Sequence, residues 1–136
     1  MASLTQLELV FVLMVGYQLK HFLCDYPLQV EYMLRKGEPG WSFFIPLATH
    51  CLVHGGFTLV ITFLLKPNVW WLALVDFFAH FIMDRVKSGP KYLGRFSDKE
   101  ASSYWNCFGL DQMVHHLTHI YIVWVLTCGY ESLPPA

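Results

Sequence analysis

Four long apolar segments, separated by polar stretches, constrain the fold of this chain more than any other feature of its sequence. Each segment approaches the roughly 20 apolar residues that a helix needs to cross the hydrocarbon core of a bilayer. Hydrophobic residues make up 55% of the 136 residues and charged residues only 14%, whereas about a quarter of the residues in soluble domains are charged. We therefore predict a single all-α integral membrane domain, residues 1–136, in which four transmembrane helices form an antiparallel bundle. The predicted spans are residues 4–23, 43–65, 69–86 and 107–128.

The stretches between these segments indicate how the predicted helices are connected. The first, YPLQVEYMLRKGEPG at residues 26–40, mixes apolar with charged residues and ends in glycine and proline, which favours a short helix at the membrane interface followed by a tight return. The second, KPN at residues 66–68, is so short that it forces an antiparallel hairpin. The third, residues 87–106, is polar and contains glycine, so we expect it to lie outside the hydrocarbon.

The uneven distribution of basic residues predicts an orientation in the membrane. Eight of the nine Lys and Arg residues fall in or beside the first and third connections, and only Lys66 falls on the other face. Because Lys and Arg are enriched in cytoplasmic loops, we expect these two connections on the cytoplasmic side of the inner membrane and both termini outside. The first segment lacks the basic region and the cleavage site of a signal peptide, so we expect it to remain as a spanning helix.

Charge and cysteine spacing exclude two other classes of site. The net charge is −1, the pI is about 6.6 and no run of basic residues is present, so nucleic acid is not an expected partner. The cysteines stand far apart without a CxxC pair, so the sequence signals neither a disulfide framework nor a thiolate zinc site. We interpret Cys24, Cys51, Cys107 and Cys128 as apolar filler residues.

Histidines and aspartates occur in the predicted helices at a spacing of four residues. Residues four apart lie on the same helix face, with their Cβ atoms about 5–6 Å apart, so two such side chains can reach one ion. Imidazole and carboxylate groups suit zinc, iron or manganese. At a rise of about 1.5 Å per residue, one pair on each helix falls at a comparable depth in the cytoplasmic half of the bundle. We therefore predict a site for one or two divalent ions, zinc first and iron or manganese as alternatives, with the ligands His21, Asp25, His50, His54, His80, Asp84, Asp111 and His115.

Single members of this set also have ordinary structural explanations. Asp25 precedes Pro27 and could cap the interfacial helix, and Asp111 could be the N-cap or first-turn acid of the fourth span. Asp84 could form an interfacial ion pair with the following Arg85 and Lys87, and one or two histidines could serve only as hydrogen-bonding groups between helices. These explanations fit single residues better than the whole set, because a cap needs no histidine one turn away.

Three further polar residues lie close to the predicted ligands. His116 points about 100° away from its neighbour on a helix of 3.6 residues per turn, so we leave it out of the site. His119 lies one turn deeper on the His115 face and is a possible ligand of a second layer. Asp76 lies one turn deeper than His80, where it could orient an imidazole.

Several motifs together resemble the signature of a small family of uncharacterised bacterial and phage integral membrane proteins, a domain of unknown function. They are HFLCDYPLQ at 21–29, Lys36, His50, HFIMDRVK at 80–87 and DQMVH at 111–115. More distantly, the pattern is similar to predicted membrane-bound metal-dependent hydrolases, in which HxxxD motifs recur at helix ends. The family pattern does not require His54, His116 or His119. The resemblance implies site roles for His21, Asp25, Gln29, Lys36, His50, His80, Asp84, Lys87, Asp111, Gln112 and His115.

The function that these residues favour is a metal-dependent hydrolase that acts on a lipid or a phosphate-bearing lipid at the cytoplasmic membrane surface. A divalent ion with an open coordination position acidifies its bound water and polarises a phosphoryl or acyl oxygen. We expect Asp84 to serve as the catalytic base. Lys36 and Lys87 would bind the anionic part of the substrate, although such lysines are more often only topology signals.

Two other classes of function remain open from the sequence. A non-enzymatic accessory or structural subunit, within a homo-oligomer or a larger membrane complex, could use the metal only to cross-link its helices. A redox or transport protein could use facing histidines to ligate haem or to relay a cation. The carboxylates beside the histidines argue against haem, because they suit a hard or borderline ion.

Overall fold

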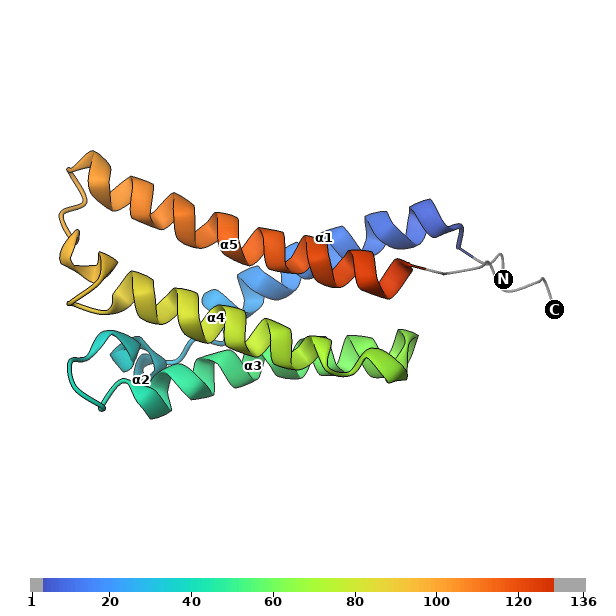
Figure 1. The fold of residues 1–136 in the computed structure, drawn as a ribbon, viewed down its shortest axis with the longest axis horizontal. Coiled ribbons are helices and arrows are strands. Elements are labelled where there is room, and N and C mark those ends of the chain that lie inside the picture. Colours follow the sequence, from blue (N-terminus) through green and yellow to red (C-terminus); the bar gives the residue numbers. More distant parts are fainter. Residues whose placement is uncertain (1–3, 129–136) are drawn as a thin grey trace.

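The computed structural model describes residues 4–128, and within them the chain forms α-helices and short 3₁₀ turns and no β-strand (Figure 1). The prediction of an all-helical chain is therefore confirmed for this part. The α-helices are α1 (Gln6–Asp25), α2 (Glu31–Leu34), α3 (Phe44–Leu65), α4 (Leu72–Ser88) and α5 (Ser102–Thr127). The 3₁₀ turns are η1 (Arg35–Gly37), η2 (Pro67–Val69) and η3 (Leu93–Arg95).

Local sequence signals explain where several helices begin and end. α1 begins at a capping box, in which the backbone N–H of Glu8 donates to Oγ1 of Thr5 while the backbone N–H of Thr5 donates to the Glu8 carboxylate. It ends shortly before Pro27, because proline has no N–H and disfavours a helical conformation in the residue before it. α5 begins five residues earlier than the predicted fourth span, because residues 102–106, Ser-Ser-Tyr-Trp-Asn, continue the helix beyond the apolar segment.

The four long helices lie alongside one another, and the short helix α2 lies at one end of them (Figure 1). α4 packs against both α3 and α5, and α1 packs against α5 and α3. The KPN segment contributes to the tight turn η2 between α3 and α4, as its length predicts. The predicted short helix of the first connection is α2, which is four residues long. This packing brings one face of each long helix to a shared interior.

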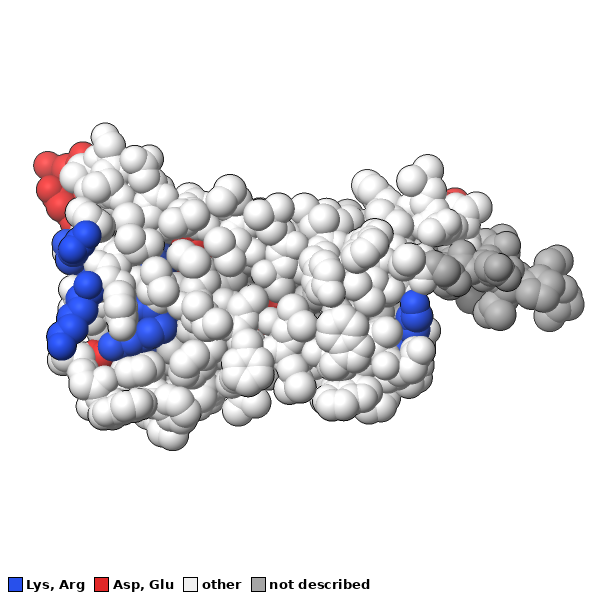
Figure 2. Space-filling model, in the orientation of Figure 1, with Lys and Arg blue, Asp and Glu red and all other residues white. Residues whose placement is uncertain are grey.

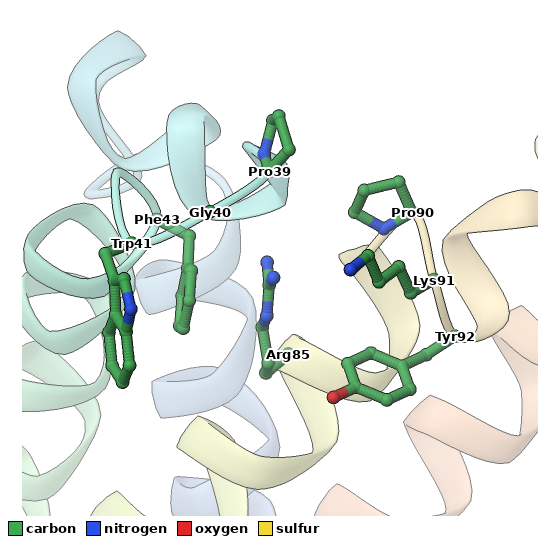
Figure 3. Close-up of a pocket in the computed structure, with 8 residues that line it drawn as sticks. All are labelled: Pro39, Gly40, Trp41, Phe43, Arg85, Pro90, Lys91 and Tyr92. Atoms are coloured by element: carbon green, nitrogen blue, oxygen red, sulfur yellow. The ribbon is translucent and has the colours of Figure 1, made fainter.

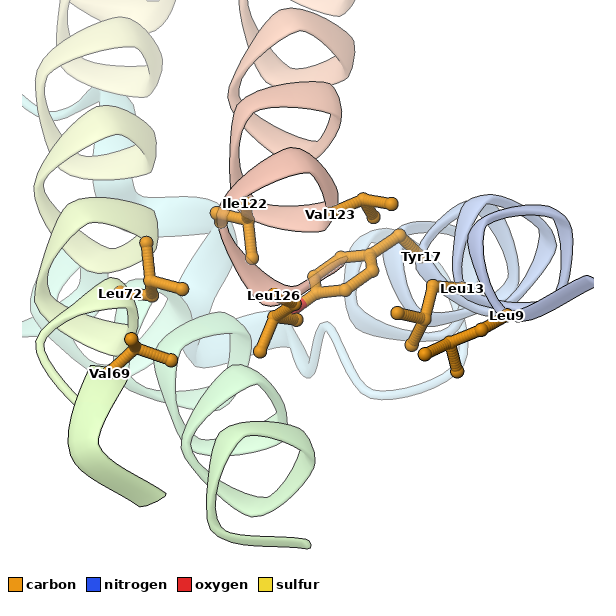
Figure 4. Close-up of a cluster of buried hydrophobic side chains, with 8 residues drawn as sticks. All are labelled: Leu9, Leu13, Tyr17, Val69, Leu72, Ile122, Val123 and Leu126. Carbon is orange, nitrogen blue, oxygen red and sulfur yellow. The ribbon is translucent and has the colours of Figure 1, made fainter. Parts of the chain in front are cut away.

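The interior of the bundle is divided into an apolar part and a polar part. The apolar part lies toward the start of α1, the start of α4 and the end of α5 (Figure 4). The polar part lies farther along α1 and contains the buried histidines and aspartates. The apolar cluster consists of Leu9, Leu13, Tyr17, Val69, Leu72, Ile122, Val123 and Leu126.

Large apolar side chains cover much of the outer surface of the long helices. Phe11 on α1 is 69% exposed, Leu64 on α3 is 78% exposed, Phe78 on α4 is 56% exposed and Trp124 on α5 is 61% exposed. By length and composition, α1 and α3 are each apolar enough to cross a membrane. α4 has 17 residues, and α5 has three histidines and an aspartate in its apolar part. Crossing by all four helices stays a prediction.

Basic side chains gather mainly at one end of the molecule, as Figure 2 shows. This is the end where α2, η1 and the α4–α5 connection lie (Figure 1). At the other end, Lys66 donates to the backbone carbonyls of Val125 and Cys128 near the end of α5. The structure thus places most of the Lys and Arg residues at one end of the bundle, which is the uneven distribution on which the predicted membrane orientation depends.

Candidate metal centre

Histidines from all four long helices meet in the polar interior. The rings of His54 and His80 have centroids 3.8 Å apart, those of His80 and His115 are 4.1 Å apart, and those of His50 and His54 are 4.8 Å apart. The His21 ring lies 5.2 Å from that of His115. Histidine is only intermediate in burial among residue types, so a concentration of buried imidazoles indicates a specific site. The buried histidines are His21, His50, His54, His80, His115 and His119, none more than 4% exposed.

Asp84 on α4 joins the histidines of α3 and α5. Its Oδ2 lies 3.1 Å from Nε2 of His50, and its Oδ1 lies 3.3 Å from Nε2 of His115. It does not form the interfacial ion pair with Arg85 and Lys87 that the sequence left open, and Lys87 pairs with Asp111 instead. The guanidinium of Arg85 instead lies 3.6 Å from the ring centroid of Phe43, and it donates to backbone carbonyls of the α2–α3 connection.

Asp25 at the end of α1 joins the histidines of α1 and α3. Its Oδ2 lies 3.0 Å from Nε2 of His21, and its Oδ1 lies 3.1 Å from Nε2 of His54 and 3.4 Å from Nε2 of His50. The alternative that Asp25 caps the next helix is wrong, because the N-cap of α2 is Val30 and no side chain caps it. The carboxylate therefore belongs to the histidine cluster.

Asp111 lies well inside α5, more than two turns after the first residue of that helix. It is therefore neither the N-cap nor a first-turn acid, because helix α5 begins earlier than the apolar segment predicts. Its Oδ1 lies 3.2 Å from Nε2 of His115, one turn along the same face. Its Oδ2 accepts hydrogen bonds from Lys87 at 2.8 Å and from Gln112 at 2.9 Å.

Several histidine ring nitrogens in this cluster have no hydrogen-bond partner within residues 4–128, although they are buried. Buried polar atoms in folded proteins are nearly always hydrogen-bonded, so a concentration of unpaired ones requires a specific explanation. Ligand atoms held ready for an ion supply such an explanation. The unpaired atoms include His50 Nδ1, His54 Nδ1, His80 Nε2, His115 Nδ1 and His119 Nδ1.

These residues form groups that could hold a metal ion. In each group of three, the ligand atoms all lie within 4.8 Å of one another, and each group joins at least two helices. Three groups consist only of predicted ligands, and together they include all eight of them. These groups are His21–His80–His115, Asp25–His50–His54 and Asp84–Asp111–His115, and the fourth is Asp76–His80–His119.

The backbone fixes which nitrogen of His80 is free to ligate. Its Nδ1 lies 2.9 Å from the backbone carbonyl oxygen of Asp76. A carbonyl oxygen can only accept, so Nδ1 carries the proton and Nε2 keeps its lone pair. Hydrogen bonding of one ring nitrogen to a carbonyl is a common way to orient a ligating histidine. His80 is therefore presented to the cluster in a form that suits metal binding.

Lysines compensate three of the four carboxylates in the cluster. Lys36 Nζ lies 2.7 Å from Asp84 Oδ2, and Lys87 Nζ lies 2.8 Å from Asp111 Oδ2. Nζ of a third lysine, Lys20, lies 2.5 Å from Asp76 Oδ2. Four carboxylates and three lysines leave one negative charge when the histidines are neutral. That charge is on Asp25, whose ion-pair partners within residues 4–128 are all histidines.

The third lysine is Lys20, which sequence reasoning did not include in the site. It is 4% exposed and lies beside His21 on α1. A charged residue inside a predicted span was the signal that could have identified it, because ionisable groups in spanning helices usually face a bundle interior. Asp76 and His119, predicted as residues of a second layer, lie together in the Asp76–His80–His119 group, which we call the inner group.

Three hollows lie near the polar interior. One, of about 200 Å³, is lined by His21, Asp25 and His116 among others, and it reaches the cluster between α1 and α5. A second, of about 220 Å³, is bordered by Lys36 and Lys87 at the basic end of the bundle. The third, of about 330 Å³, contains no residue of the cluster (Figure 3). It is lined by Pro39, Gly40, Trp41, Phe43, Arg85, Pro90, Lys91 and Tyr92.

Fold and site together define a class: an all-helical protein with a buried histidine–aspartate cluster that could hold a metal ion. The chain belongs to the family described as Protein of unknown function (DUF3307), whose sequence model matches residues 10–134. The match includes every residue of the cluster and confirms the predicted membership of an uncharacterised family. No curated protein and no solved structure matches the chain.

Proposed function

We propose that this protein is a membrane-embedded, metal-dependent hydrolase that acts on a lipid or a phosphate-bearing lipid at the cytoplasmic face of the inner membrane. The observation that carries the proposal is the convergence of candidate histidine and aspartate ligand atoms from all four long helices in the buried interior. Zinc is the proposed ion, with iron or manganese as alternatives, because imidazole and carboxylate ligands suit all three.

The outer surface supports insertion of all four long helices. Soluble monomers rarely expose continuous apolar surfaces of large area. Here, exposed Leu, Ile, Val, Phe and Trp side chains occur along each long helix, including α4 and α5. In the proposed arrangement the basic end of Figure 2 faces the cytoplasm, the termini lie outside, and the cluster lies in the cytoplasmic half.

Charge compensation supports Asp25, His50 and His54 as the main metal-binding group. Asp84 and Asp111 already contact lysine ammonium groups, whereas the ion-pair partners of the Asp25 carboxylate in the described part of the chain are all histidines. A divalent ion is therefore best accommodated beside Asp25, where negative charge is not compensated. The adjoining hollow between α1 and α5 provides room for water or a substrate to reach this group.

The neighbouring residues suit hydrolysis of an anionic lipid. A bound divalent ion would supply an activated water and polarise an oxygen of the substrate. Asp84 contacts His50 on one side and Lys36 on the other, so it is suitably located to accept a proton between the metal-binding group and the basic hollow. Lys36 and Lys87 border that hollow and would attract a phosphate group.

The division of the interior supports chemistry at one membrane face. The apolar cluster of Figure 4 fills the bundle between the polar residues and the end of the molecule at which α1 begins. The two hollows that border the cluster, in contrast, are lined by residues at the end of α1 or of α4 together with residues of the first half of α5. This arrangement favours a site that opens toward one side over a path through the whole bundle.

The direct test is phosphate release from lipid vesicles by the full chain purified in mild detergent and loaded with zinc. Vesicles should contain a phosphate monoester lipid, either phosphatidic acid or a polyprenyl phosphate. We expect Asp84→Asn to lower turnover by at least about 100-fold, the usual contribution of a general base. The exposed Asp98, in the α4–α5 connection, offers the control Asp98→Asn, which should keep full activity. Equal turnover by both variants would contradict the proposal.

A second function, a non-enzymatic subunit stabilised by a metal, is favoured by one observation. Every candidate group takes ligands from at least two helices, so an ion in any of them would cross-link the bundle. In this case the purified chain would retain stoichiometric metal and co-purify in a larger complex. It would release no phosphate from the vesicles.

A further inference from the structure

The inner group of the cluster differs from the others because a lysine lies inside it. Asp76, His80 and His119 offer three ligand atoms within 4.8 Å of one another. Lys20 Nζ lies 2.5 Å from Asp76 Oδ2 and 3.4 Å from His119 Nε2. The ammonium group thus contacts two of the three residues that would bind an ion there.

The surroundings of Lys20 are those of a fully buried cation. Lys20 is 4% exposed and Asp76 is fully buried. Thr58 on α3 donates a second hydrogen bond to Asp76 Oδ2, at 2.6 Å, so this oxygen is saturated. Burial of a charge is costly unless it is paired and hydrogen-bonded. The Lys20–Asp76 pair meets both conditions, and its charges cancel.

The hydrogen-bond chemistry fixes the role of His119 in this arrangement. An ammonium group has three donors and no acceptor, so His119 Nε2 must accept from Lys20 with its lone pair. The atom that faces Asp76 is therefore already engaged with a cation. Oδ1 of Asp76 lies 3.5 Å from the same nitrogen, so an ion bound between them would overlap the ammonium group.

We propose that Lys20 is a built-in cation. Its ammonium group occupies the position of a divalent ion between Asp76, His80 and His119, and it keeps metal out of this inner group. Metal binding is then confined to the other three groups, Asp25–His50–His54, Asp84–Asp111–His115 and His21–His80–His115. The inner group serves instead to orient His80, whose free Nε2 faces His21 and His115. The inference rests on the proposed function only in assuming that the other three groups bind metal.

The test is the number of divalent ions per chain, measured by elemental analysis after equilibration of the full-length protein with zinc in mild detergent. Lys20→Ala removes the ammonium group and makes room, so it should bind one ion more than the wild type. Lys20→Met removes the charge but fills the space, so its stoichiometry should equal that of the wild type. Adding Asp76→Asn to Lys20→Ala should abolish the gain.

Two results would overturn the proposal. One is a folded Lys20→Ala variant without an additional ion, or a Lys20→Met variant that gains one. The other is loss of an ion from His119→Ala in the otherwise wild-type chain, because that would show that the inner group binds metal despite Lys20. This second variant keeps the test decisive if Lys20→Ala does not fold.

These outcomes can be distinguished from failure of the proposed function. If the wild-type chain binds no metal, the hydrolase proposal fails. The Lys20→Ala variant should still gain its ion, rising from none to one. If the wild type binds metal but Lys20→Ala gains nothing, only the inference about Lys20 fails.

Discussion

The ammonium group of Lys36 lies 2.7 Å from Oδ2 of Asp84, and this contact joins the turn after α2 to the last turns of α4. The same oxygen lies 3.1 Å from Nε2 of His50. Lys36 therefore compensates the charge of a carboxylate that also contacts the histidine cluster. A lysine predicted from the sequence to bind an anionic substrate is thus placed next to the candidate base.

Replacement of Lys36 separates a role in substrate binding from a role in metal binding. Lys36→Met should retain metal, because it removes a positive charge from a site for cations. In the phosphate-release assay it should raise KM for the lipid phosphate by about tenfold or more, because an opposing charge is lost. Lys91→Met, an exposed change in the α4–α5 connection, is the control and should leave KM unaltered. A loss of metal from Lys36→Met would contradict this account.

His115 and His116 form a matched pair for the metal site. They are adjacent on α5, but His115 is 1% exposed and contacts Asp84 and Asp111, whereas His116 is exposed and belongs to none of the candidate groups. His115→Ala should weaken zinc binding at least tenfold, measured by competition with a chromogenic chelator. His116→Ala should bind zinc like the wild type. Equal affinities of the two variants would exclude His115 as a ligand.

Metal removal should lower the stability of the bundle. A ligand that binds only the folded state stabilises it by about 2.7 kcal/mol at a free concentration 100 times its Kd. Because each candidate group joins at least two helices, EDTA should lower the melting temperature of the detergent-solubilised chain, and added zinc should restore it. An identical melting temperature with and without chelator would indicate that no ion cross-links the helices.

Two neighbouring glycines of α3 test the close packing of α3 on α4. A Cβ at Gly55 would lie 3.0 Å from the backbone oxygen of Ala73 and 3.3 Å from Cβ of Phe77, whereas a Cβ at Gly56 would have no neighbour within 4 Å. Gly55→Ala should destabilise the protein by about 1–3 kcal/mol, as overpacking does. Gly56→Ala should be neutral or slightly stabilising, because alanine favours a helix. Thermal melting would decide, and a more stable Gly55→Ala variant would contradict the packing described.

The sequence predicted the interior of this protein better than it predicted the helix ends. The four-residue spacing of His21 and Asp25, repeated on the other helices, was sufficient to bring all eight candidate ligands into one cluster. It was sufficient because helix periodicity determines which side chains share a face, and the short KPN turn fixes how α3 returns as α4. Hydrophobicity located the start of α5 less well, because its first turn mixes serine and asparagine with aromatic residues.

Partners of the lysines were beyond prediction from the sequence. Lys20, Lys36 and Lys87 contact aspartates 56, 48 and 24 residues away, and such pairs depend on the relative height and rotation of helices. The structural explanations for Asp25, Asp84 and Asp111 were wrong for the same reason. Each of them compared a residue only with its sequence neighbours, whereas the contacts that matter come from other helices.

The most direct test of the central claim is the metal content of the purified wild-type chain. Elemental analysis should be carried out after equilibration with zinc, iron or manganese and removal of the free ion, with Asp25→Asn as the comparison. The account predicts one or two divalent ions per wild-type chain and at least one fewer in Asp25→Asn. A folded wild-type chain that retains none of the three metals would contradict it.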